Sequence, residues 1–256
     1  MSWEALDPGI LGPALAAGLL VLATHVPLGI QVLARGIVFI DLAIAQMAGT
    51  GVIAAHALGG ELNGWEVQGA AAAAALAGAV LLTWSERRWP ELQEALIGTL
   101  FVLAATAGVL LLAGDVRGGE HLRELLVGQI LWVGAGQLLP AALLTAALLA
   151  AWFGWGPRLG RLGFYLVFAL AVTASVQLVG IYLVFASLIV PALATRGARA
   201  RRRWAYAVGV AGYLLGLALA ALADLPPGPL VVWAMALSGV AAAALLRSPG
   251  RVPPAV

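Results

Sequence analysis

Asp41 is the residue of this sequence best placed to do chemistry, because its carboxyl group falls inside an apolar stretch at residues 37–59. A buried ionisable group costs several kcal/mol unless it is paired, so such a group marks a candidate cation site or transport pathway. Gln46 is its nearest polar neighbour along the stretch, and His25 lies in the preceding apolar stretch, just before Pro27. We therefore predict that Asp41, His25 and Gln46 contact a metal ion or line a pathway.

Each of these polar residues also has a structural interpretation. Arg35 precedes Asp41 by roughly 9 Å along a helix, close enough for an ion pair. The imidazole of His25 could approach the backbone carbonyl that the ring of Pro27 frees. His56 lies roughly 60° around a helix from Asp41 and about four turns along it, so the two cannot be neighbouring ligands of one ion on a straight helix. The sequence leaves these alternatives open.

No group of residues suggests catalysis. The chain has no cysteine, which excludes disulfides, thiolate metal sites and cysteine nucleophiles. Its basic residues are all arginine, so it has no glycine-rich phosphate loop ending in Gly-Lys-Ser/Thr. We expect a chain that is not an enzyme, binds no cofactor and depends on a partner for any ATP binding. The arginines cluster at the ends of apolar stretches, which favours a role in membrane topology over nucleic-acid binding.

The amino-acid composition of the chain indicates what kind of structure positions the polar residues named above. Hydrophobic residues make up 62% of the chain, charged residues 10%, and the mean hydropathy is +1.00; soluble domains have about 25% charged residues. We predict one all-α domain, residues 1–256, that is a polytopic integral membrane bundle of eight or nine transmembrane helices. The predicted spans are 10–34, 37–59, 67–85, 93–113, 125–154, 162–179, 181–196, 204–223 and 228–247. The stretch 125–154 is expected to be broken by WVGAGQLLP, residues 132–140.

One uncharged run, residues 162–195, could cross a bilayer twice, but only as two short spans. The arginine-bearing connections should be cytoplasmic, which gives nine crossings with the amino terminus outside and the carboxyl terminus inside. We expect the first apolar stretch to be a retained span and not a cleaved signal peptide. Trp65 is expected to anchor a span end at the lipid headgroups.

Two groups of polar residues are assigned structural roles. Glu91, Gln93 and Glu94 open the span after Pro90, where acidic side chains favour the helix dipole, so we expect them to cap that helix. Three further glutamines are interpreted as hydrogen-bonding groups between helices: Gln129, Gln137 and Gln177.

Five segments carry a recognisable pattern: PLGIQVLARGIVFIDLAIAQMAGTG (27–51), EALIGTLFVLAATAGVLLL (94–112), LLVGQILWV (125–133), QLVGIYLVFASLIVPALATR (177–196) and DLPPGPLVV (224–232). In this order they resemble segments of the membrane permease subunits of bacterial ABC importers for zinc, manganese and related divalent metals. The resemblance implies a multi-pass protein of the bacterial inner membrane that forms a homodimer among membrane lipids. It also implies a cytoplasmic ATP-binding subunit that drives alternating access, an extracytoplasmic metal-binding protein, and zinc or manganese as cargo.

Two differences from the family pattern affect which properties of the family can be expected of this chain. The family has a histidine four residues after the intramembrane aspartate, whereas this chain has Ala45. The family also has a cytoplasmic docking helix where this chain has only GWGPRLGRLG, residues 154–163. We therefore expect the ATPase contact at Arg158, Arg161 and Arg199. An ABC permease for a non-metal or chelated-metal solute, and an ion-coupled secondary transporter, are the alternatives.

Overall fold

The computed structural model describes residues 8–58, 64–113 and 118–246, which form helices and no strand. The first half of the chain contains α1 (Pro8–Arg35), α2 (Ile40–Ala57), α3 (Trp65–Arg88), the 3₁₀ helix η2 (Pro90–Leu92), α4 (Gln93–Leu111) and α5 (Gly118–Val127). The second half contains the 3₁₀ helix η3 (Ile130–Trp132), α6 (Ala135–Val179), α7 (Ile181–Ala194), α8 (Arg201–Ala223) and α9 (Pro227–Leu246).

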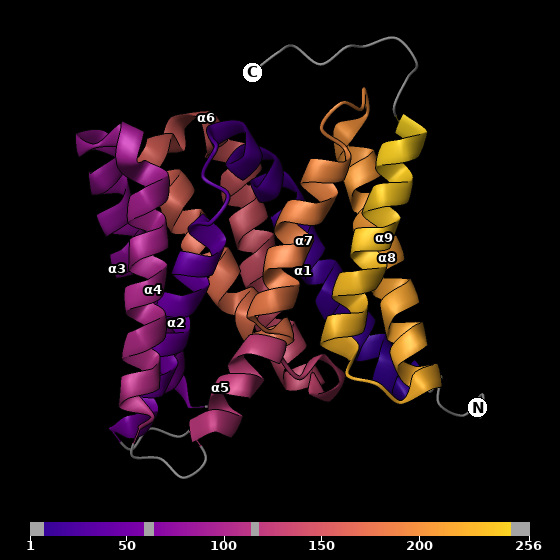
Figure 1. Cartoon of the computed structure of the whole chain (residues 1–256), viewed down its shortest axis with the longest axis horizontal. Coiled ribbons are helices and arrows are strands. Elements are labelled where there is room, and N and C mark those ends of the chain that lie inside the picture. Colours follow the sequence, from indigo (N-terminus) through magenta and orange to yellow (C-terminus); the bar gives the residue numbers. More distant parts are fainter. Residues whose placement is uncertain (1–7, 59–63, 114–117, 247–256) are drawn as a thin grey trace.

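The described helices stand side by side as a bundle (Figure 1). Eight helices in the described residues are long and apolar enough to cross a membrane. The shorter α7 is a further apolar helix of 14 residues, about 21 Å long against a hydrocarbon core of about 30 Å. The prediction of an all-α membrane bundle with eight or nine spans is confirmed.

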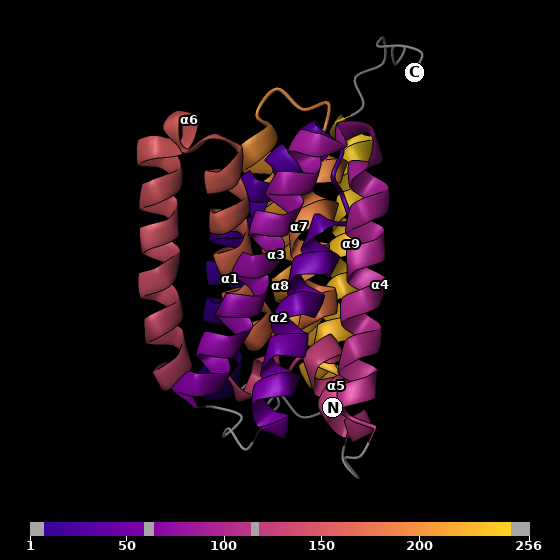
Figure 2. The ribbon, with the colours of Figure 1, turned by 90° about the vertical axis from the view of Figure 1, so that its left-hand side faces the viewer.

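Helix α6 is two antiparallel arms joined by a kink at Gly160, whose φ of 60° and ψ of −160° are not helical. The arms, Ala135–Trp155 and Gly160–Val179, are each long enough to span a membrane. Figure 2 shows the first arm standing at the edge of the bundle, next to the second. The rings of Trp152 and Phe164, one from each arm, lie 5.9 Å apart between centroids and join the arms near the kink.

The predicted span at residues 125–154 is wrong at its start. Residues up to Val127 belong to α5, and Gly128 then adopts a φ of 73°, a conformation that ends a helix. A short 3₁₀ turn follows, and the spanning helix begins only at Ala135. The sequence predicted a break within WVGAGQLLP, residues 132–140, whereas the structure places it earlier, between Val127 and Ala135.

The uncharged run at residues 162–195 does form two helices, but only the second is short: the second arm of α6 is long enough to span a membrane, whereas α7 has 14 residues. The break falls at Gly180, with φ 80° and ψ 164°, which separates the second arm of α6 from α7. Because L side chains rarely adopt this backbone conformation, a glycine is required where the chain reverses direction. The run therefore makes a tight helical hairpin.

The arginine-rich connections lie at one end of the bundle, the upper end in Figure 1. This end holds the α1–α2 turn, the α3–α4 turn, the kink of α6 and the α7–α8 connection, as the alternating directions of the helices require. The positive-inside rule assigns it to the cytoplasm. We call the opposite end the outer end; there α2 ends, and α3 and the first arm of α6 begin.

Small residues hold the helices close together. A Cβ atom added to Gly51 of α2 would lie 2.6 Å from the carbonyl oxygen of Ala70 in α3. A Cβ on Gly212 of α8 would lie 2.6 Å from the side chain of Met235 in α9. Such close backbone approach lets dispersion forces stabilise helix pairs in lipid, as the alanine- and glycine-rich sequence of these spans predicts.

Candidate functional site

Asp41 lies in the first turn of α2 and is fully buried. Neither of its carboxylate oxygens has a hydrogen-bond partner within the described part of the chain. Arg35, the alternative partner, instead places its guanidinium carbon 3.9 Å from the ring centroid of Phe164. The alternative ion pair does not form, and the partial positive charge of the α2 N-terminus is left to offset the Asp41 carboxylate.

His25 is fully buried in α1. Its Nδ1 atom lies 3.0 Å from the carbonyl oxygen of Val21 and 3.0 Å from the hydroxyl oxygen of Thr24. A carbonyl oxygen only accepts, so this contact favours the tautomer with the proton on Nδ1 and a lone pair on Nε2. Within the described residues Nε2 has no hydrogen-bond partner. The imidazole thus contacts the carbonyl of Val21 and keeps a nitrogen available to a ligand.

Gln46 is also buried, on α2. It follows Asp41 by five residues, roughly 140° around a helix, so the two side chains leave α2 on different faces. In the part of the chain that the structure describes, no three His, Asp or Glu side chains lie close enough to hold one ion. Asp41, His25 and Gln46 are therefore buried as expected, while their shared role in a pathway stays a prediction.

A cavity of about 860 Å³, which we call the outer cavity, lies at the outer end. Its lining comes from both arms of α6, from the ends of α2 and α3 that face each other there, and from the segment 125–133. The polar side chains that line it among the described residues are His56, Gln68, Gln129, Gln137 and Gln177, and the indoles are Trp65 and Trp132. Sequence reasoning missed this site because its residues come from five separate segments. The signal available was that the glutamines all fall near outer span ends.

Two glycines bring backbone segments into direct contact beside the outer cavity. Gly128 follows α5, Gly180 separates the second arm of α6 from α7, and both have positive φ. A Cβ added to Gly180 would lie 2.6 Å from the Cα atom of Gly128. A Cβ on Gly228, at the start of α9, would lie 2.6 Å from the carbonyl oxygen of Val127. The segment after α5 is thus held between the α6–α7 break and α9.

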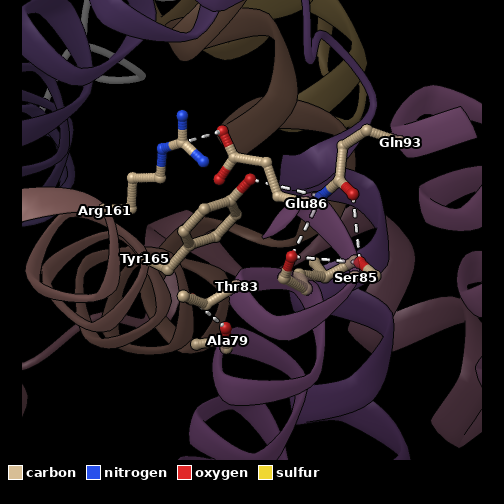
Figure 3. A network of polar contacts seen from close by, with 8 residues as sticks. Ala79, Thr83, Ser85, Glu86, Gln93, Arg161 and Tyr165 are labelled. Atoms are coloured by element: carbon tan, nitrogen blue, oxygen red, sulfur yellow. Dashed lines mark hydrogen bonds and ion pairs between the residues drawn. The ribbon is translucent and has the colours of Figure 1, made fainter. Parts of the chain in front are cut away.

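A polar network ties α3, α4 and the second arm of α6 together at the cytoplasmic end (Figure 3). The Nε2 amide of Gln93 donates to the carbonyl of Leu82 and to the hydroxyl of Tyr165, each at 3.2 Å. The hydroxyl of Ser85 donates to Oε1 of Gln93 at 3.0 Å. Arg161, beside the kink, reaches Oε1 of Glu86 at 3.9 Å. The network fixes the turn between α3 and α4 against the α6 kink.

This network corrects the capping interpretation. The N-terminus of α4 has no side-chain cap, because Gln93 is buried and bonds to other helices. The carboxylate of Glu94 accepts a hydrogen bond from the backbone N–H of Phe39 at 3.4 Å, which connects α4 to the α1–α2 turn just before Asp41. Gln93 and Glu94 thus both connect helices. Their position at the start of α4 had suggested a capping role instead.

Comparison with known proteins identifies this architecture. The model of the ABC 3 transport family matches residues 9–155 and 149–246, nearly the whole chain. The chain belongs to the ABC 3 transport family. No curated protein matches it.

Two solved structures have the same fold as this ABC 3 family permease. One is PsaBC from Streptococcus pneumoniae in complex with Fab, with a TM-score of 0.76 and 19% identity over 94% of this chain and 95% of that one. The other is an ABC transporter assigned to the metal-chelate type, in an inward-facing conformation. It has a TM-score of 0.67 and 18% identity over 91% of this chain and 85% of that one. The chain is thus a multi-pass membrane permease of an ABC transporter, which operates with an ATPase and a substrate-binding protein.

The three arginines predicted to contact the ATPase are all exposed. Arg158 and Arg161 flank the kink of α6, and Arg199 lies in the connection before α8. All three therefore lie at the cytoplasmic end of the permease, where an ATPase would bind. Their contact with it stays a prediction.

Proposed function

We propose that this permease imports a divalent metal ion, zinc or manganese, across the inner membrane of a bacterium. It would act as a homodimer surrounded by lipid, with a cytoplasmic ATPase driving alternating access and an extracytoplasmic metal-binding protein delivering the cargo. Membership of an ABC transport family supports the mode of energy coupling. The choice of a cation rests on Asp41.

The observation that carries the proposal is the buried, unpartnered carboxylate of Asp41. A carboxylate inside a membrane protein is costly when nothing compensates its charge, and such residues usually mark ion pathways. A passing divalent cation would compensate this charge more fully than the α2 N-terminus does, and carboxylate oxygens suit both zinc and manganese. The energetic cost of Asp41 is thus consistent with a role during transport.

His25 supports the same interpretation from another helix. Its Nε2 lone pair is buried and unpartnered in the described structure, and imidazole nitrogen is a good ligand for zinc. The contact of Nδ1 with Val21 orients the ring, as outer-sphere hydrogen bonds do for many histidine ligands. We propose that both groups contact the cation as it moves, with Gln46 lining the pathway nearby.

In this proposal the permease is not an enzyme and holds no cofactor of its own. ATP hydrolysis belongs to the partner subunit, in keeping with a sequence that has no Gly-Lys-Ser/Thr loop. The motion of the ATPase would reach the permease at its arginine-bearing cytoplasmic end. The rival secondary transporter would need no such partner.

The test is uptake of ⁶⁵Zn or ⁵⁴Mn into proteoliposomes that contain the permease, its ATPase and its binding protein. We expect ATP-dependent uptake that falls at least tenfold in Asp41→Asn, because the neutral amide cannot balance a cation. The matched control is Asp224→Asn, at an exposed turn where asparagine tolerates the observed φ of 53°. Metal uptake that is independent of ATP, or equal in wild type and Asp41→Asn, would refute the proposal.

A further inference from the structure

The outer cavity is much larger than an ion needs. A divalent cation with six waters occupies about 180 Å³, taking ~30 Å³ for each water. The cavity measures about 860 Å³, and pockets that bind small organic molecules measure about 300–1,000 Å³. Its size therefore matches an organic ligand or a complex of one.

The described polar lining of the cavity is also of the kind that recognises organic groups. Four glutamines line this space: Gln68, Gln129, Gln137 and Gln177. A neutral amide offers both donors and an acceptor, which suit the carboxylate, hydroxyl and amide groups of an organic molecule. Amide oxygen is a weak ligand for zinc beside imidazole or thiolate. The lining thus favours hydrogen bonding over direct metal coordination.

One of these amides has a defined orientation. Oε1 of Gln137 accepts a hydrogen bond from the backbone N–H of Gly134 at 3.3 Å, at the start of the first arm of α6. The side-chain oxygen is therefore engaged, and the NH₂ group is the part of Gln137 that can donate to a ligand. The second arm contributes Gln177, which is partly buried, to the lining of the same cavity. Both arms of α6 can therefore contribute to binding a ligand in the outer cavity.

The remaining described lining is aromatic and aliphatic. Trp65 and Trp132 are 85% and 82% exposed, and both border the cavity together with aliphatic residues such as Val52 and Leu144. Indole faces bind flat or apolar parts of organic molecules and add an N–H donor. Small-molecule sites are usually lined by apolar side chains, with a few polar groups that fix the orientation of the ligand.

We infer that the outer cavity receives the divalent metal as a complex with a small organic chelator, whose outer groups hydrogen-bond to the glutamines. This inference rests on the proposed metal import and names the form of the cargo. The chelator supplies the metal ligands while the complex is in the cavity, so the protein contributes hydrogen bonds and apolar contact. Trp65, predicted as a lipid anchor, then also forms part of the cavity wall.

The test uses the complete transporter in proteoliposomes with two labels. The probe is ⁶⁵Zn bound to two [¹⁴C]histidine molecules, compared with ⁶⁵Zn alone and with [¹⁴C]histidine alone. We expect both labels to enter together, in a ratio of two histidines to one zinc, and at least tenfold faster than zinc alone. Gln177→Leu should reduce this uptake about tenfold, whereas Gln31→Leu, an exposed glutamine of α1 outside the cavity, should not.

The outcomes separate the two proposals. If zinc enters without histidine, the inference is wrong and metal import stands. If histidine enters without zinc, or if neither label enters, zinc import is wrong and the inference falls with it. If both labels enter together and Gln177→Leu does not reduce their uptake, the complex does not depend on the outer cavity. That result would also overturn the inference.

Discussion

The hydroxyl of Tyr206 in α8 donates a hydrogen bond to the carbonyl oxygen of Ala23 in α1 at 3.1 Å. Ala23 is four residues before Pro27, whose ring has no N–H to bond that carbonyl. A side chain distant in sequence therefore satisfies a backbone group that the proline leaves unpaired inside the membrane. The imidazole of His25 contacts the carbonyl of Val21 and not the carbonyl of Ala23 that Pro27 frees.

Tyr206→Phe should destabilise the permease by about 1 kcal/mol, because it leaves the carbonyl of Ala23 without a donor. The free energy of unfolding can be followed by tryptophan fluorescence during heating in detergent. Tyr182→Phe, at an exposed tyrosine of α7, is the control and should change the Tm little. Equal Tm values for the two variants would contradict this role for Tyr206.

Gly180→Ala should disrupt the packing of α5 and η3 against the α6–α7 break. A positive φ combined with ψ of 164° is essentially confined to glycine and costs other residues about 1–3 kcal/mol, and the new Cβ would collide with the backbone of Gly128. We expect a lower Tm and loss of ATP-dependent uptake. Gly12→Ala, where no atom lies within 4 Å of the added Cβ, should be neutral or slightly stabilising. A Gly180→Ala variant as stable as wild type would show that the segment can move aside.

Gln93→Leu should destabilise the cytoplasmic end by about 2–3 kcal/mol, since it leaves the carbonyl of Leu82 and the hydroxyls of Ser85 and Tyr165 without this partner. The measurement is again thermal unfolding in detergent. Thr99→Val is a fair comparison, because the Thr99 hydroxyl is exposed and bonds only within its own helix. A capping role for Gln93 would predict a much smaller loss.

Charge reversal at Arg158, Arg161 and Arg199 should weaken binding of the ATPase by tenfold or more. The measurement is co-purification of the ATPase at low and high salt, because screening shortens the reach of exposed charges to about 8 Å at 0.15 M salt. The wild-type complex should therefore weaken as salt rises. Arg123→Glu, on α5 at the outer end, supplies a matched charge change and should leave the complex intact.

The sequence predicted most spans because lipid exposure demands long apolar runs that end at charged or glycine-rich turns. It also predicted the short hairpin around Gly180, since an uncharged run of that length can only fold back. It predicted a break in the stretch 125–154 but placed it at residues 132–140, because composition does not reveal the backbone contacts with Gly180 and α9 beside the end of α5 at Val127. The outer cavity and the network of Gln93 both depend on residues that are adjacent only after folding.

The kink of α6 has a consequence for how the polypeptide can be handled. No atom lies within 4 Å of a Cβ atom built on Gly160. In the first arm of α6, only 6% of the apolar stretch that could span a membrane is buried inside the bundle. A side chain added at Gly160 would meet no other atom, and the first arm contributes little to the buried core of the bundle. The gene can therefore be split at this codon, and the two co-expressed fragments should reassociate in the bilayer into a working permease.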